Sequence, residues 1–545
     1  MRATISAGLA TVTLGALGAL AGASSLGCEN TASDCAKLGT VCTGGGGAGG
    51  GGAGGGGAGG GGAGGGGAGG GGAGGGGMGG GTTSSTSSSS TTTSEPCAVV
   101  KVKSFGDAAD QSARSLLVTP ASDVVVAGTF FGDLQFGMTE LTAPGPDPSF
   151  FVARSGADLA PNFARRFDAA YKAGALDANG AFVAVGIQSA AVDFGCGSVD
   201  LDPAFDVGLF VVKVDSLGVC VFHRVFGATA VPTVDVAVGP SGEIALVGGF
   251  EGSLAVDDAA GALPFTSAGG TDIFVAKLAD TGAHVWSEAY GDAGEDQATA
   301  VVIHSDAKIV VAGDHTGELD FENGDPPTNS GTQTAPFLVA FNGNGTVPWA
   351  RSFQVATGSQ RAFGLALDTS VEGAPAIVLS GDLEGVVESA KVLPTVAGDA
   401  AVGLKDANHG VFLARFALDN TGKLLSSGAF AGAGKLAVHG TSVDSAGRIL
   451  LAGWLDQSLT FAAGAGELTS GGVPRAFMAV LGKDLTHQKS ATFGGAGESR
   501  AFGAAFEGGD ALVAGSYSGT LEVQGSAVVT SKGGDDLFVA RLCAE

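Results

Sequence analysis

Short apolar segments recur at a regular spacing along the C-terminal four-fifths of the chain. One recurring segment is a strand-like run with a central phenylalanine, as in residues 272–278 (DIFVAKL). The central phenylalanines are Phe151, Phe210, Phe274, Phe337, Phe412, Phe477 and Phe538. The six intervals from first to last cover 387 residues, a mean period of about 64.5. This regularity predicts seven copies of one supersecondary unit.

Two further patterns give the same count. A β-branched run ends in glycine once per repeat, at Gly128, Gly186, Gly248, Gly313, Gly381, Gly453 and Gly515. An aromatic residue precedes a small-residue turn at Phe105, Phe167, Phe226, Tyr290, Phe353, Phe430 and Phe493. Three patterns that agree on seven make an accidental repeat improbable.

Each repeat is interpreted as four short strands. In the fourth repeat they cover residues 298–304, 308–315, 336–341 and 347–353. The second strand is almost continuously apolar, which indicates burial on both faces, and helical periodicity is absent. Repeats of four strands are typical of a β-propeller, whereas a period near 64 is long for a linear β-solenoid, the alternative. We therefore predict an all-β, seven-bladed β-propeller over residues 97–545.

The two ends of the repeat region predict how the ring closes. Residues 99–105 match a fourth strand that precedes the first complete repeat, and the chain stops just after Leu542. We expect the N-terminal strand to complete the last blade. Alignment on the turn 279–282 places Cys543 and Cys97 at its first and fourth positions, which predicts a disulfide between them.

The N-terminus has the features of an export signal. Arg2 precedes an apolar, acid-free stretch, residues 7–23, which is too short and too rich in glycine for a membrane span. Residues 25–28 (SLGC) resemble a bacterial lipobox, although Ser25 replaces the usual leucine. Residues 1–27 would then be a lipoprotein-type signal peptide and Cys28 the lipidated residue. The alternative is cleavage after Ala23, which gives a secreted protein.

A low-complexity segment separates the signal from the repeats. A short cysteine-containing segment, residues 28–43, leads into residues 44–96, where glycine and alanine give way to serine and threonine. Such a segment has almost nothing to bury and is predicted to be a disordered, flexible linker with an r.m.s. reach of roughly 40 Å.

The remaining cysteines suit an oxidising compartment. If Cys28 carries lipid, the simplest further pairs are Cys35 with Cys42 and Cys196 with Cys220. Six cysteines allow fifteen pairings, and two buried free thiols at positions 196 and 220 are the other interpretation.

The net charge of the chain disfavours some classes of binding partner. The formal net charge is −26, of which the repeat region carries −25, because residues 1–43 cancel and the linker adds only Glu95. An acidic domain repels nucleic acid and anionic lipid. We therefore expect no nucleic-acid partner, membrane contact only through a lipid anchor, and a monomer.

Motifs for catalysis are sparse. The seven histidines are dispersed and are interpreted as surface or strand-end residues, and no nucleophile elbow occurs in a strand–helix context. Loop carboxylates are weak Ca²⁺ candidates, with turn-forming acids on an acidic surface as the alternative. They are Asp107, Asp110, Asp292, Glu295, Asp296 and Glu498. No cofactor and no catalytic residue are predicted.

The repeat resembles the bacterial seven-bladed β-propeller repeat called SBBP. The clearest copy is residues 290–301 (YGDAGEDQATAV), and the likeness covers roughly residues 98–543. Residues 167–170 (FDAA) and 353–356 (FQVA) depart from its glycine-rich opening. The resemblance implies export and a propeller, and it implies no shared catalytic residue.

Three functions follow as hypotheses. The first is a non-catalytic lipoprotein, anchored at the outer membrane or cell surface, whose propeller binds or scaffolds a protein or glycan. The second is a secreted polysaccharide lyase or glycosidase that uses loop carboxylates. The third is a structural envelope protein. Two carboxylates converging with a basic or aromatic group in one pocket would favour the enzyme.

Overall fold

A computed structural model of the chain describes residues 99–256, 263–322, 328–353, 359–384, 409–462, 465–523 and 526–544. All described residues belong to one compact unit, Thr91–Glu545. Within these ranges every regular element is a strand, so no described helix is available to cross a bilayer. The predicted all-β class is confirmed.

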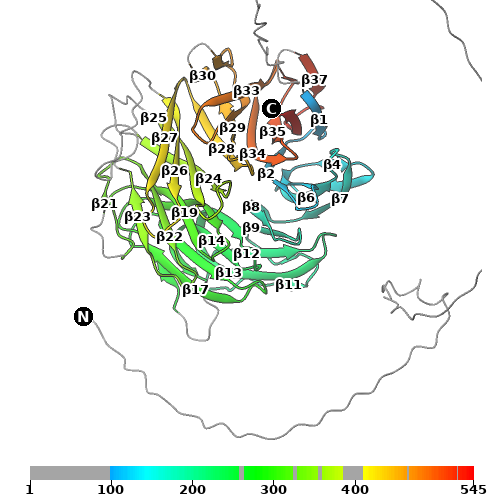
Figure 1. Cartoon of the computed structure of the whole chain (residues 1–545). Coiled ribbons are helices and arrows are strands. Elements are labelled where there is room, and N and C mark those ends of the chain that lie inside the picture. Colours follow the sequence, from blue (N-terminus) through cyan, green and yellow to red (C-terminus); the bar gives the residue numbers. More distant parts are fainter. Residues whose placement is uncertain are drawn as a thin grey trace, which may run out of the picture. The chain divides into compact units, whose positions relative to one another are not determined.

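The sheets form a propeller-like ring, in which five sheets each contain one four-stranded blade (Figure 1). Three of them are four-stranded: β2 (Gln111–Val118), β3 (Val124–Phe130), β6 (Ser149–Ser155) and β7 (Pro161–Phe167); β18 (Asp296–Ile303), β19 (Ile309–His315), β22 (Ala335–Phe341) and β23 (Trp349–Ser352); β34 (Ser499–Glu507), β35 (Asp510–Tyr517), β38 (Asp536–Cys543) and β1 (Val99–Phe105).

The other two of these sheets have six strands, because a hairpin extends each blade. They contain β24 (Ser359–Asp368), β25 (Ala376–Glu384), β26 (His409–Ala417), β27 (Leu424–Ala433), β30 (Ser458–Ala462) and β31 (Ala465–Thr469), then β28 (Leu436–Val443), β29 (Ile449–Leu455), β32 (Arg475–Leu481), β33 (His487–Phe493), β36 (Thr520–Val523) and β37 (Ser526–Thr530).

The remaining long strands form one eight-stranded sheet. Its strands are β8 (Ala170–Leu176), β9 (Phe182–Gln188), β12 (Val207–Val214), β13 (Cys220–Val238), β14 (Ile244–Ala255), β15 (Phe265–Thr266), β16 (Asp272–Leu278) and β17 (His284–Tyr290). Three small hairpins complete the described structure: β4 (Asp133–Phe136) with β5 (Thr139–Thr142), β10 (Val192–Asp193) with β11 (Ser198–Val199), and β20 (Glu318–Leu319) with β21 (Thr328–Asn329).

The prediction of seven separate blades is therefore wrong as a count of separate sheets. The eight-stranded sheet is continuous because β13 pairs with β12 through residues 220–228 and with β14 mainly through residues 233–238. In the loops of Asp107 and Asp292, by contrast, a bend separates consecutive repeats, and these two side chains accept backbone N–H groups of their own loops. The sequence after Phe226 (GATAVP) forms no such bend, and the backbone stays extended through β13.

Ring closure by the N-terminal strand is confirmed. β1 pairs antiparallel with β38, with Val99 opposite Leu542 and Ser104 opposite Phe538. The Ser104 hydroxyl lies 2.7 Å from the Tyr517 hydroxyl, and the Phe105 ring lies 4.6 Å from that of Phe136. The first and last strands of the repeat region therefore share one blade. Cys97 lies outside the described residues, so its disulfide with Cys543 stays a prediction.

Burial follows the predicted pattern. All seven residues of β19 are buried, and its bounds and those of β18, β22 and β23 agree with the predicted strands to within two residues. Six hydrophobic clusters fill the space between different sheets, and a seventh lies within the eight-stranded sheet, between its β9–β12 part and its β13–β16 part. Each β-sheet face is thus covered by its neighbour, which is how a propeller avoids exposed apolar sheet surface.

Basic residues near the ends of the third strands pair with acids of their own blade, and two of them also contact the next blade. Arg154 pairs with Asp123 at 2.9 Å in its own blade and donates to the carbonyls of Gly180 and Ser216 in the next. Lys213 pairs with Asp177 at 2.8 Å, and Arg415 pairs with Asp368 while also donating to the Lys483 carbonyl. Most of these side chains are shielded from water, so the pairs lose less to solvent screening than surface pairs.

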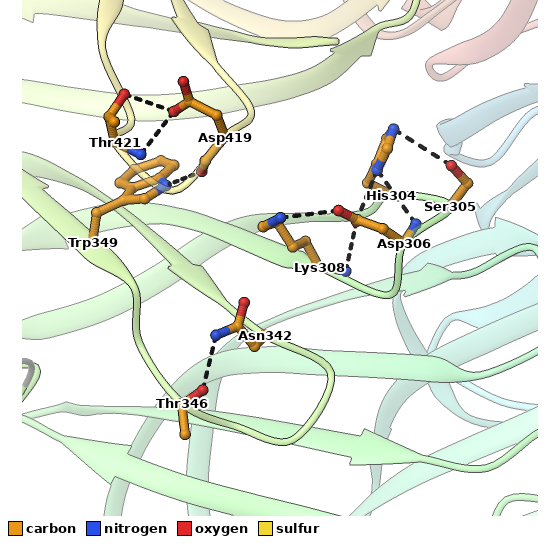
Figure 2. A network of polar contacts seen from close by, with 9 residues as sticks. All are labelled: His304, Ser305, Asp306, Lys308, Asn342, Thr346, Trp349, Asp419 and Thr421. Carbon is orange, nitrogen blue, oxygen red and sulfur yellow. Dashed lines mark hydrogen bonds and ion pairs between the residues drawn. The ribbon is translucent and has the colours of Figure 1, made fainter. Parts of the chain in front are cut away.

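Tryptophans make a second contact between blades. Trp349 of β23 donates its indole N–H to the carbonyl of Asp419 at 2.9 Å, in the turn between β26 and β27 (Figure 2). The Asp419 carboxylate in turn accepts the backbone N–H and hydroxyl of Thr421, both at 2.7 Å. Trp286 of β17 repeats the arrangement on the Gly343 carbonyl at 3.1 Å.

The glycine that ends each apolar run has a steric role. A Cβ at Gly313 would lie 2.1 Å from the Gln297 carbonyl oxygen of the adjacent first strand. The other six glycines of the pattern meet a backbone carbonyl at 1.9–2.1 Å in the same way. These positions therefore require glycine because the first strand approaches them too closely for any side chain.

One predicted disulfide is confirmed. Cys196 and Cys220 are bonded, with their Cα atoms 5.6 Å apart, and they join the segment beside β10 to the start of β13. The signal peptide, Cys28, Cys35, Cys42 and the linker lie outside the described residues and stay predictions.

Alanine at Gly313 tests the close approach of the first and second strands. The new Cβ overlaps backbone that cannot move without breaking the ladder, so we expect a loss of about 1–3 kcal/mol in the free energy of unfolding. Chemical denaturation measures it. Gly145→Ala is the matched control, because a Cβ there meets nothing within 4 Å. Equal stability of the two variants would contradict the steric role.

Candidate binding site in the axial cavity

A cavity of about 330 Å³ lies where the first strands meet. Its walls come from β2, β8, β13, β18, β24, β28 and β34. We call it the axial cavity. Its charged and aromatic lining residues are Arg114, Lys172, Asp235, Phe363, His439 and Phe502. Every strand that contributes to the wall is the first strand after an aromatic turn of the repeat.

β-Bulges direct most of these side chains into the cavity. In six of the wall strands the pairing with the second strand skips one residue just after the partner of the repeat glycine. The skipped residues are Arg114, Lys172, Thr299, Phe363, His439 and Phe502. A bulge re-aims a side chain away from the ladder, and all six residues line the cavity.

Four neighbouring strands contribute a cationic and aromatic group. The Arg114 guanidinium carbon lies 4.8 Å from the centroid of the Phe502 ring, a cation–π distance. The His439 ring lies 5.2 Å from Phe502 and 5.8 Å from Phe363. Arg114 is exposed to the cavity and has no ion pair or hydrogen bond to any described residue. Its N–H donors are therefore available to a ligand.

The opposite wall is hydrophilic. Lys172 of β8 is exposed and donates to the Pro232 carbonyl at 3.4 Å. Asp235 of β13 accepts the backbone N–H of Val301 at 3.0 Å. Nearby, Tyr171 donates its hydroxyl to Ser115 at 2.7 Å. The cavity thus has an aromatic side with one cation and a polar side with one cation and one carboxylate.

Burial sets the charge of the titrating groups. Burial, with smaller contributions from Arg114 and Arg500, lowers the pKa of His439 to about 4, so the imidazole is neutral at pH 7. Burial raises the pKa of Asp235 to about 6, although backbone N–H groups of Val236 and Val301 oppose the shift. At neutral pH the lining therefore carries two cations and one carboxylate, a positive interior in a domain of net charge −25.

The predicted loop carboxylates lie elsewhere and organise turns. Asp107 accepts N–H groups from Ala109 and Asp133, and Asp110 accepts the backbone N–H of Asp535 at 3.0 Å. Asp292 accepts N–H groups from Gly294 and Glu318. The two loops belong to different blades. Among the described residues no three acidic, histidine or cysteine side chains gather as metal ligands would.

Asp296 differs from the other loop acids. It is fully buried as the first residue of β18 and accepts the Asp292 N–H at 3.0 Å. Burial, with the nearby charges of Asp292 and Asp272, raises its pKa to about 7. Glu295 beside it is exposed, as is Glu498, which pairs with Arg500 at 2.8 Å. None of these acids lines the axial cavity.

A second cavity, of about 750 Å³, lies between the blades of β6–β7 and β8–β9. Its one basic group is already paired: Arg166 lies 3.4 Å from Asp168, which also accepts the Ser149 hydroxyl at 2.8 Å. We therefore place the candidate site in the axial cavity, where Arg114 has no such partner.

Sequence reasoning missed the site. The interpretation of every histidine as a surface or strand-end residue is wrong for His439, which lies within β28. A signal was present, since Arg114, Lys172, Thr299 and His439 each stand fourteen residues before the repeat glycine. Position alone does not reveal that the residue is bulged, so this signal had no meaning before the strand register was known.

Comparisons with known proteins give limited help. No protein-family model matches the chain. Regulatory protein FlaEY of Caulobacter vibrioides is 25% identical over 338 residues, 60% of this chain and 34% of that protein. The chain therefore spans about a third of that relative. The resemblance to SBBP repeats rests on the repeat motifs alone.

Solved structures match weakly. A protein of unknown function from Dyadobacter fermentans has a TM-score of 0.38 and 10% identity, with 82% of this chain and 99% of that one covered. A subtype N11 neuraminidase-like protein of A/flat-faced bat/Peru has a TM-score of 0.34 and 7% identity, with 83% and 95% covered. Likenesses at these scores carry no argument about function.

His439→Phe tests the buried neutral histidine. The wild-type folded state resists protonation of His439, whose pKa of about 4 lies below the ordinary 6.5, so its contribution to stability is complete above pH 6.5 and is lost as the pH falls toward 4. Between pH 6.5 and 4, the free energy of unfolding of the variant should therefore fall by up to about 3 kcal/mol less than that of the wild type. Denaturation at pH 4, 5.5 and 7.5 measures the difference. Phe363 and Phe502 show that this ring fits the equivalent bulge.

Above pH 7 the two proteins should differ only by a constant offset. An unchanged slope between pH 6.5 and 4 would show that His439 is not held neutral.

Proposed function

We propose that this protein is an exported, non-catalytic binding protein whose propeller presents the axial cavity to a ligand at the cell surface. The observation that carries the proposal is Arg114, an unpaired guanidinium directed into the cavity by a bulge beside the Phe502 ring. An exposed guanidinium without a protein partner can bind a ligand without breaking a contact inside the protein. Ligand sites also combine apolar walls with a few convergent polar groups.

Binding suits the cavity better than hydrolysis does. Glycosidases place two carboxylates on either side of the bond to be cleaved, and Asp235 is the one carboxylate among the residues that line the cavity. His439 is neutral and packs between aromatic rings, and no described acid contacts it. The lining thus supplies recognition groups without an acid–base pair.

We also propose that the ring has seven blades, with the eight-stranded sheet counting as two fused blades. The first strands contact one another in a circuit, from β2 through β8, β13, β18, β24 and β28 to β34 and back to β2. β13 would then be the fourth strand of one blade and the first strand of the next, in agreement with its two pairing segments. An experimental structure with a different number of wall strands would refute this count.

The surface location is part of the proposal and rests on the N-terminal sequence. Cys28 after Ser25-Leu26-Gly27 would carry the lipid, and residues 44–96 would separate the propeller from the membrane. We expect Cys28→Ala to abolish incorporation of radiolabelled palmitate and to release the protein into the medium. Cys42→Ala is the matched control. Labelling that survives Cys28→Ala would favour cleavage after Ala23 and a secreted protein.

A binding screen tests the function. Purified protein is applied to arrays of cell-surface glycans and envelope proteins, and each hit is titrated with the Arg114→Ala/Lys172→Ala variant. We expect at least a tenfold loss of affinity in this variant and none in Lys423→Ala, whose exposed lysine lies outside the cavity. An affinity that is unchanged in the double variant would mean that the binding site lies elsewhere. Cleavage of a bound glycan would contradict the non-catalytic role.

A further inference from the structure

We infer that the ligand of the axial cavity is a sugar acid, a uronic acid unit of a glycan. This inference rests on the proposed binding function and specifies its ligand. Three groups in the cavity match three parts of such a ligand: a guanidinium for the carboxylate, aromatic rings for the apolar face of the sugar ring, and polar groups for the hydroxyls.

The guanidinium supplies the carboxylate site. Arg114 presents a planar fork of N–H donors, and a carboxylate accepts two of them in parallel. The Phe502 ring against its cation holds the guanidinium plane, at 4.8 Å from centroid to carbon, without using its hydrogen bonds. A pre-oriented, unpaired arginine loses little freedom on binding, which raises affinity.

The aromatic rings supply a stacking surface. Phe363, His439 and Phe502 lie in consecutive contact on β24, β28 and β34, with ring centroids 5.2–5.8 Å apart. All three side chains line the cavity and are partly exposed there. The ring planes are inclined by 62° and 41°, so a sugar ring would stack on one of them at a time. An aromatic face next to a cation fits a ligand that is charged at one edge and apolar on one face. A phosphate or sulfate ion has no such face.

Polar groups on the opposite wall suit the hydroxyls. Asp235 accepts the backbone N–H groups of Val236 and Val301 and retains further lone pairs, and Lys172 uses one of its three donors on the Pro232 carbonyl. An aromatic carboxylic acid would leave this wall without partners. A polyhydroxylated acid satisfies both walls at once.

The size and charge of the site limit how much of a glycan enters. A volume of about 330 Å³ is at the small end for ligand cavities, so we expect a short segment rather than a folded chain. The acidic domain repels a long polyanion, whereas Arg114 and Lys172 attract a single carboxylate inside. The preferred ligand is therefore a chain end or a short oligomer.

Isothermal titration calorimetry tests the inference on the whole chain. The probes are trimers of galacturonic acid and of glucuronic acid, the methyl ester of each trimer, benzoate and inorganic phosphate. Esterification removes the charge and keeps the ring, so we expect at least tenfold weaker binding of the esters. We expect the same loss of acid binding in Arg114→Gln, and a loss for acid and ester alike in Phe502→Leu. Lys423→Ala should bind as the wild type does.

The outcomes separate the inference from the proposed function. Equal binding of acid and ester, or affinity for benzoate or phosphate equal to that for the trimers, overturns the sugar-acid inference and leaves a binding cavity. Binding of an envelope protein or a neutral glycan, with no binding of either uronate trimer, also overturns the sugar-acid inference and leaves the binding function in place. Thermal midpoints of Arg114→Gln and Phe502→Leu show whether each is folded, and Asp235→Asn, with reduced hydroxyl recognition, gives an independent readout if one is not.

Discussion

The close approach of the first and second strands is the constraint on which both the fold and the cavity depend. A hydrogen atom in place of a Cβ at the repeat glycine lets a carbonyl of the first strand come within 1.9–2.1 Å of where that Cβ would lie. In six of the seven wall strands the backbone bulges at the next residue. The glycine and the side chain that enters the cavity are thus two consequences of one backbone arrangement.

Charge is divided between the framework and the cavity. Arg154, Lys213 and Arg415 are engaged by acids of their own blade, and Arg154 and Arg415 also reach carbonyls of the next blade. These residues hold the ring together and have little capacity left for a ligand. Arg114 and Lys172 occupy a different structural position, the bulge, and no described acid pairs with them. Residues of one chemical type therefore have two roles that only the register distinguishes.

The sequence allowed most of the architecture to be predicted, because strands, turns and closure depend on local and periodic patterns. The apolar run of β19 and the unpaired strand at residues 99–105 were sufficient for burial and for pairing with β38. The fused sheet was not predicted, because it depends on the backbone staying extended after Phe226, a local departure from a repeat otherwise recognised by its similarities. The cavity residues were not predicted, because they vary in type from blade to blade and share only a bulge.

The pairing of β1 with β38 also affects how the molecule is made. A ribosome synthesises β1 before any other strand of the ring and its partner last, so more than four hundred residues emerge before that edge can be covered. Contacts so distant along the chain close slowly, and an uncovered strand edge invites pairing with another molecule. Nascent chains of this protein therefore have a long period in which a neighbouring copy can donate the missing strand.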